Sequence, residues 1–136
     1  MLGPHFISAE RMIDGPRPLF GADWSIAVST PTQAREAVDY LNSQGADFIK
    51  VQSLVPRQAY FAIADEARKQ HLPFAGHVPP SVSALEASQT GQRSIEHLTG
   101  VLLGCSSDEE NLTASIVRLV EDPKTPESLL VPGPLL

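Results

Sequence analysis

Cysteine is almost absent from this 136-residue sequence, and no long apolar stretch occurs in it. The single cysteine, Cys105, excludes an internal disulfide bond. No apolar run approaches the roughly 20 residues that are needed to cross a bilayer. The N-terminus also lacks the basic region and apolar stretch of a secretory signal. We therefore expect a soluble cytoplasmic protein.

Basic residues are also few, with 10 Lys and Arg against 16 Asp and Glu, which gives a formal net charge of -6. No basic run is interleaved with aromatic residues, so nucleic acid and anionic membrane surfaces are poor candidate partners. A glycine-rich phosphate loop, a G-x-S-x-G motif and a C-x-x-C motif are all missing. With 42% hydrophobic and 19% charged residues, the composition is that of one globular domain with a real core.

Short apolar runs alternate with helical patterns along the chain. Runs rich in strand-forming residues predict strands at 5–9, 47–51, 73–78 and 93–98, with a minor extra strand at 25–29. Apolar spacing and capping residues predict helices from Thr30 to Gly45 and at 56–70, 81–89 and 108–121. Residues 1–121 are thus expected to form the folded part, and the proline-rich residues 122–136 an irregular tail.

This order of elements predicts an α/β fold with about four parallel strands that alternate with helices. Two architectures fit it, an open doubly wound sheet and part of a (β/α)8 barrel of the TIM type. In both, ligands bind at the carboxyl ends of the strands. Four parallel strands also leave two open edges, which favour a homo-oligomer.

Lys50 interrupts the apolar run DFIKV near the end of a predicted strand. Burying an unpaired ammonium group is very costly, which leaves three outcomes for this side chain. It reaches solvent at the strand end, or it loses its proton and serves as a Schiff-base nucleophile. In the third outcome, the neutral amine takes up carbon dioxide and becomes a carbamate, an anionic oxygen ligand for metals.

Two histidines occupy matching positions on the next two predicted strands, His77 in FAGHV and His97 in SIEHL. A single histidine in a strand is more often a core residue than a ligand. Two at equivalent places favour a metal site, because neutral imidazole is a common metal ligand. In a strand, Glu96 and His97 would point to opposite faces, and Glu96 would be a salt-bridge partner or would orient a ligand.

Other polar residues have simpler explanations. Arg57 and Tyr60 follow the Lys50 strand, where they would contact a substrate or merely begin a helix. Cys105 is expected to be a small apolar filler rather than a nucleophile. His5 and His71 are expected to lie at the surface or at a helix end.

Taken together, the segments GADFIKV, AGHV and SIEHLTG resemble the amidohydrolase superfamily, in particular its imidazolonepropionase-like and prolidase-like branch. GPHFIS is similar to the third strand of that family, so the resemblance spans roughly residues 3–105. It implies a (β/α)8 barrel with two divalent metals, often zinc. It also implies that Lys50 is a carboxylated lysine that bridges the metals, and that His77 and His97 bind the second metal.

Two parts of the family site have no counterpart here. The H-x-H motif of the first strand is missing, as is the aspartate of strand eight, which binds metal and acts as general base. A complete barrel typically needs about 250 residues, so the chain is expected to be a fragment that covers strands three to six.

The resemblance thus implies a fragment of a metal-dependent hydrolase that cleaves C–N bonds in amides, peptides or cyclic amides. Because half of the site is missing, we expect little activity from the chain alone. Two other interpretations stay open: a lyase of the TIM-barrel type that uses Lys50 as a Schiff base, and a non-catalytic half-barrel module.

Overall fold

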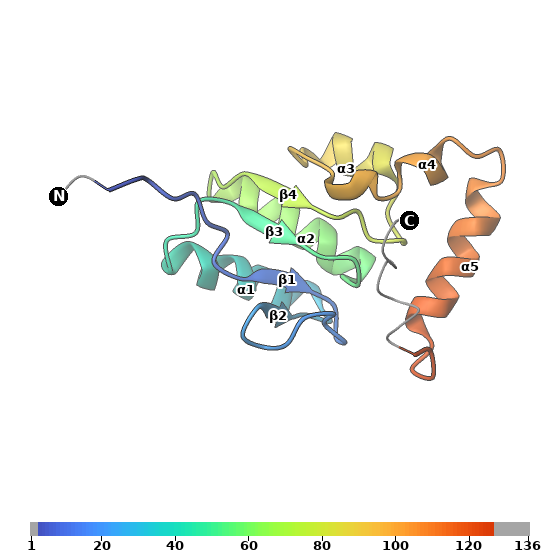
Figure 1. Ribbon diagram of the computed structural model, residues 1–136, viewed down its shortest axis with the longest axis horizontal. Coiled ribbons are helices and arrows are strands. Elements are labelled where there is room, and N and C mark those ends of the chain that lie inside the picture. Colours follow the sequence, from blue (N-terminus) through green and yellow to red (C-terminus); the bar gives the residue numbers. More distant parts are fainter. Residues whose placement is uncertain (1–2, 127–136) are drawn as a thin grey trace.

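The computed structural model describes residues 3–126, which form a parallel sheet with helices packed around it (Figure 1). Four strands pair in the order β2-β1-β3-β4, and every pair is parallel. The strands are β1 (Met12–Asp14), β2 (Ser25–Ala27), β3 (Ile49–Val51) and β4 (Phe74–Gly76). The helices are α1 (Pro31–Ser43), α2 (Arg57–Lys69), α3 (Ala84–Thr90), α4 (Val101–Gly104) and α5 (Glu109–Glu121). The predicted α/β class with four parallel strands is confirmed.

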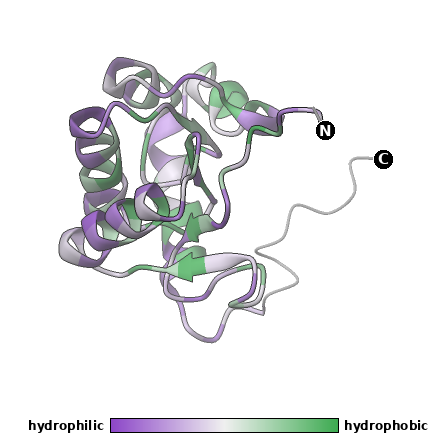
Figure 2. Ribbon diagram, turned by 90° about the vertical axis from the view of Figure 1, so that its left-hand side faces the viewer, coloured by the Kyte–Doolittle hydropathy of each residue, from purple (hydrophilic) through white to green (hydrophobic). Residues whose placement is uncertain are grey.

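Helices α1 and α2 pack against each other behind the sheet and supply half of the buried core residues (Figure 1). The hydroxyl of Thr30 accepts a hydrogen bond from the backbone N–H of Gln33 (3.2 Å) and so caps α1, as predicted. Figure 2 shows hydrophilic and hydrophobic stretches alternating along the helices. The buried face of α1 consists of Ala34, Ala37, Val38 and Leu41, and that of α2 of Ala59, Tyr60, Ala62, Ile63, Ala64 and Ala67. The alanines among these residues allow the two helices to approach closely.

The strands bury alternate residues, which fixes the face on which Lys50 lies. Ile49 and Val51 are fully buried in the core that α1 and α2 share, whereas Lys50 between them is half-buried. Successive side chains of a strand point to opposite faces. Lys50 therefore lies on the face away from α1 and α2, which would be the inner face in a barrel.

The predicted strand at 5–9 is wrong. Residues 5–9 have no regular structure, and Phe6 and Ile7 are 80% and 73% exposed. They touch the sheet region through Ser8, whose N–H donates to a carboxylate oxygen of Asp47 (2.9 Å) and whose carbonyl accepts from the Asp47 N–H (2.8 Å). The strand begins later, at Met12, because residues 12–14 pair with β2 on one side and β3 on the other. This pairing involves distant segments, so local strand propensity does not predict it.

The predicted strand at 93–98 is also wrong. Only one bridge, between Gly76 and Ile95, joins this segment to β4. Residues Glu96–Leu98 instead form a short 3₁₀ turn. Parallel pairing beyond residue 95 therefore does not occur, and this changes the geometry of the candidate site.

Asp14 links the ends of β1 and β3. Its buried carboxylate accepts hydrogen bonds from the N–H groups of Gly15 (2.8 Å), Leu19 (2.9 Å) and Leu54 (3.0 Å). Burial raises the pKa of Asp14, and these N–H donors oppose that shift. A side chain at Gly15 would place its Cβ 1.8 Å from the Leu54 carbonyl oxygen, so glycine is required for this contact.

Helix α5 stands apart from the sheet and contacts mainly α4 (Figure 1). None of its residues is buried. Its far end is held by Arg17, whose guanidinium donates to the backbone carbonyls of Val120 (2.6 Å) and Asp122 (3.2 Å). Of the predicted irregular tail, residues 122–126 are described and have no helix or strand, while residues 127–136 lie outside the described part of the chain.

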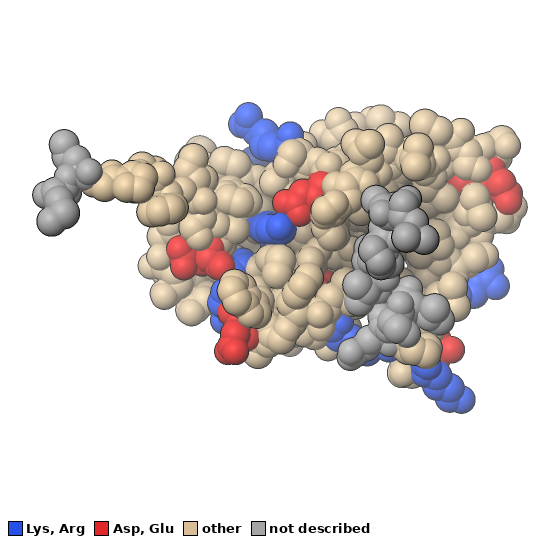
Figure 3. Space-filling view, viewed as in Figure 1, with Lys and Arg blue, Asp and Glu red and all other residues tan. Residues whose placement is uncertain are grey.

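Acidic and basic groups lie in small separate patches on the face shown in Figure 3. None of the helices within residues 3–126 is long and apolar enough to cross a membrane.

Candidate metal centre

The candidate site is built where β3 and β4 end. The backbone N–H of His77 donates to the carbonyl of Val51 (3.0 Å), which carries the pairing one residue beyond β4. Gly76 makes this possible, because its φ is +121° and an added Cβ would lie 2.3 Å from the Val51 carbonyl oxygen. The close approach of the two strands places His77 beside the end of the Lys50 strand.

The 3₁₀ turn brings two neighbouring side chains into the same site. His97 and Leu98 both have a φ of +54°, a left-handed conformation that is rare for residues other than glycine. The prediction that Glu96 and His97 face opposite sides is therefore wrong, because the alternation of a strand does not apply to a turn. Thr99 anchors the turn, since its hydroxyl accepts from the Val78 N–H (2.9 Å) and donates to the Glu96 carbonyl (3.2 Å).

Four chemically active side chains meet here. The Glu96 carboxylate oxygen Oε2 lies 3.0 Å from the Lys50 ammonium and 3.6 Å from Nε2 of His77. The rings of His77 and His97 meet edge to face, with centroids 5.2 Å apart. One potential ligand atom from each of His77, Glu96 and His97 lies within 4.8 Å of the other two. The sequence predicted that Lys50, His77 and His97 form one site, and the structure brings them together around Glu96.

The surroundings of His77 favour its neutral form. Burial lowers the pKa of His77, and nearby Lys50 and His97 lower it further, while Glu96 opposes the shift. The other ring nitrogen, Nδ1, lies 2.6 Å from the hydroxyl of Ser53. Of the two tautomers that this contact allows, the one that donates from Nδ1 to Ser53 leaves the Nε2 lone pair free, and Nε2 lies 3.6 Å from Oε2 of Glu96.

The donor set fits a divalent metal. Imidazole nitrogen and carboxylate oxygen are both zinc ligands, and three protein ligands with an open position are typical of catalytic zinc. His77 is buried, Glu96 is half-buried and His97 is exposed, so the group is open to solvent on one side. Lys50 lies beside this group, with its Nζ 3.0 Å from Oε2 of Glu96, and the three outcomes for its side chain stay predictions.

Glu96 is the residue whose place sequence reasoning missed. Its position directly before His97 was the available signal. However, a strand at 93–98 would place the side chains of Glu96 and His97 on opposite faces of the sheet. Ser53 gave no signal beyond following the predicted Lys50 strand by a few residues.

The other candidates have structural roles or none. Tyr60 is buried and donates its hydroxyl to the Gln92 side chain (2.5 Å), so it is a core residue. Arg57 pairs with Glu86 and donates to the Ser81 carbonyl (2.8 Å). The expectation that Cys105 fills the core is wrong, because it is exposed on the short α4–α5 connection, where no neighbouring strand covers it.

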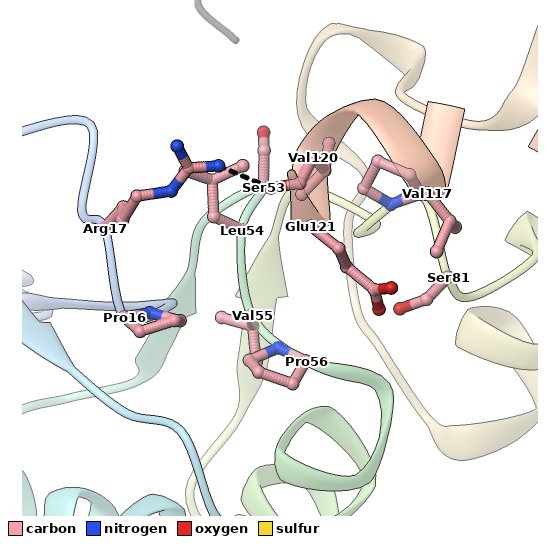
Figure 4. A pocket seen from close by; sticks show the side chains of 11 residues that line it. Pro16, Arg17, Ser53, Leu54, Val55, Pro56, Ser81, Val117, Val120 and Glu121 are labelled. Atoms are coloured by element: carbon pink, nitrogen blue, oxygen red, sulfur yellow. Dashed lines mark hydrogen bonds between the residues drawn. The ribbon is translucent and has the colours of Figure 1, made fainter. Parts of the chain in front are cut away.

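Two cavities adjoin the ends of β3 and β4. The larger, of about 940 Å³, lies between α5 and the segment 78–83 and is lined mainly by apolar residues, with Ser53 at its edge. The smaller cavity, of about 200 Å³, is shown in Figure 4. There, Arg17 reaches toward the end of α5, and Ser53 lies between Arg17 and α5. Ser53 therefore links His77 to both cavities, at the end of the sheet where parallel α/β folds bind ligands.

Comparison with known proteins found a similar structure. A bottromycin amidohydrolase of known structure matches the chain with a TM-score of 0.59 at 28% sequence identity. The match covers 79% of this chain and 24% of that chain. No protein-family model and no curated protein matches the sequence. The structural match confirms the resemblance to the amidohydrolase superfamily and the partial-barrel architecture, and the chain spans about a quarter of the amidohydrolase that it matches.

Proposed function

We propose that this amidohydrolase-like partial barrel carries one metal-binding wall of a hydrolase that cleaves C–N bonds in amides, peptides or cyclic amides. The observation that supports the proposal is the convergence of His77, Glu96 and His97, with ligand atoms within 4.8 Å of one another. The cluster lies at the strand ends of a chain that matches an amidohydrolase structure. A small molecule or a peptide would be the substrate.

In this proposal, zinc is the metal, and His77 and His97 hold it through their imidazole nitrogens. When bound, the metal supplies Lewis-acid polarisation of the scissile carbonyl group and a nucleophile at neutral pH. Ser53 orients the His77 ring through Nδ1, 2.6 Å away, so that Nε2 is available as the ligand atom.

Lys50 becomes a ligand in this proposal only after carboxylation. Its neutral amine adds to carbon dioxide, a C–N bond forms, and the nitrogen loses one proton to solvent, leaving an anionic carbamate. This step requires Lys50 to leave its ion pair with Glu96, 3.0 Å away. The carbamate oxygens would then bind metal beside the two histidines.

The chain alone should have little hydrolase activity. The sequence has no H-x-H motif, and in the matched fold a whole barrel needs eight strands, of which the described residues form four. The two histidines and Lys50 would thus supply only one wall of the site.

Zinc titration of the purified 136-residue chain against a competing chelator tests the proposal. We expect one tight site that weakens at least about tenfold in His77→Ala, because a ligand is lost. His71→Ala is the matched control, since His71 lies at the end of α2 and outside the cluster. Equal zinc affinity of the two variants would contradict the proposal.

A further inference from the structure

We propose that Glu96 is itself a metal ligand, so that His77, Glu96 and His97 hold one divalent cation without carboxylation of Lys50. This inference rests on the proposed metal function but changes its ligand set. It replaces a carbamate, which the chain must acquire from carbon dioxide, with a carboxylate that the chain already carries. Zinc is the natural probe, because two histidines and one glutamate are a known zinc ligand set.

The spacing of the donor atoms supports a shared cation. Two ligands that each lie about 2.0–2.1 Å from a tetrahedral zinc ion are roughly 3.3 Å from each other. Nε2 of His77 and Oε2 of Glu96 are 3.6 Å apart, close to that value. All three donor atoms lie within 4.8 Å of one another. Small side-chain rotations, rather than backbone movement, would close the set.

The local backbone explains why adjacent residues can both bind. In an extended strand, Glu96 and His97 would diverge, but the positive φ of His97 and Leu98 turns both side chains toward His77. The turn is tied to β4 through Thr99, which bonds to Val78 and to the Glu96 carbonyl. Backbone strain that is held in place by such contacts is often found at functional sites.

Lys50 then has a different role from the one that the family resemblance implies. Its Nζ lies 3.0 Å from Oε2 of Glu96, the same oxygen that lies 3.6 Å from Nε2 of His77. A bound cation and the Lys50 ammonium would both interact with the Glu96 carboxylate. Lys50 would therefore compete with the metal for the negative charge of Glu96. Removing the positive charge of Lys50 should therefore leave metal affinity unchanged or raise it. A required carbamate predicts the opposite.

The test compares zinc affinity of the full chain and its variants in carbonate-free buffer and in buffer with bicarbonate. We expect tight binding without bicarbonate, a loss of at least about tenfold in Glu96→Gln, and no loss in Lys50→Met. Glu110→Gln is the matched control, because it removes one carboxylate from the exposed surface of α5. Unfolding by urea shows whether each variant is folded before it is titrated.

The outcomes separate the two proposals. Three results together would overturn Glu96 as a ligand and support the carbamate site. Glu96→Gln would bind zinc as tightly as the unmodified chain, Lys50→Met would lose zinc binding, and the unmodified chain would bind zinc tightly only when bicarbonate is present. If His77→Ala has no effect, the proposed metal function itself fails. If Glu96→Gln does not fold, bicarbonate-independent binding by the unmodified chain and retained binding by Lys50→Met still decide the question.

Discussion

Three helices of this protein have the same length and a similar amphipathic pattern, yet two of them have a buried face and the third has none. Helices α1, α2 and α5 each contain 13 residues. The first two bury four and six residues, whereas α5 buries none, and its Leu112 and Leu119 are 43% and 56% exposed. Amphipathic spacing therefore forms a helix in each case, but it does not supply the surface against which the helix packs.

The sheet explains the difference. Helix α1 leads from β2 to β3 and α2 leads from β3 to β4, so each lies against the strands that it joins. Helix α5 follows the segment 93–98, which forms one bridge and no strand, and within the described residues no strand comes after it. Strand pairing on both sides is what gives a crossover helix its core face.

The largest predicted effect follows from truncating one leucine-sized side chain in each region. Ile63→Ala in α2 should lower the free energy of unfolding by about 2–5 kcal/mol, because Ile63 is fully buried and the cavity cannot fill. Leu119→Ala in α5 should change it by about 0.5 kcal/mol or less, as at other exposed sites. Urea unfolding measures both. Similar losses would show that α5 is packed in solution.

A smaller effect is expected from the glycine that joins the sheet to the site. Gly76→Ala should lower the unfolding free energy by about 1–3 kcal/mol and also weaken zinc binding, because the new Cβ would displace His77 from β3. Gly91→Ala is the control, since its φ is also positive (+96°) but nothing lies within 4 Å of an added Cβ. Equal losses of zinc affinity would mean that the close approach at Gly76 does not position His77.

The smallest effect concerns the ion pair between Arg57 of α2 and Glu86 of α3. Hydrogen bonds from Arg57, and then from the backbone and side chain of Ser83, lower the pKa of Glu86 from 4.5 to about 2. A depressed pKa adds stability above the unfolded value, and this stability is lost as pH falls from about 4.5 toward 2. Glu86→Gln should thus cost about 1 kcal/mol or less at pH 7, since the pair is exposed.

Urea midpoints at pH 7 and near pH 2 test this linkage. The difference between the unmodified chain and Glu86→Gln should shrink near pH 2, because Glu86 is then protonated in the unfolded state and about half protonated in the folded state. Glutamine at this position retains an oxygen for the Ser83 capping box, so the helix start is preserved. A difference that is constant with pH would show that the pair does not contribute through charge.

Much of the fold could be predicted from the sequence where the signals were local. The Thr30 cap, the buried faces of α1 and α2 and the strands around Lys50 and Ala75 all follow from residue spacing and capping chemistry. The strands at 5–9 and 93–98 were wrong for one reason. Both segments have strand-forming residues, but a strand also needs a partner in register, and that partner comes from elsewhere in the chain.

The candidate site, too, could be predicted only in part from the sequence. That Lys50, His77 and His97 lie close together could be predicted, because parallel strands bring their carboxyl ends to one edge. The central position of Glu96 could not, because it depends on a turn at residues 96–98 with two positive φ angles. Local propensity does not predict such a conformation for histidine and leucine.

By itself, the sequence determined which residue types are present and which helices form, because capping and apolar spacing act over a few residues. It also indicated that Lys50, His77 and His97 lie near one edge of the sheet. Only the tertiary structure decided that β1 starts at Met12, that α5 lacks a core face, and that Glu96 joins the histidines beside Lys50. These features depend on contacts between distant segments, whose free energy exists only after the sheet has assembled.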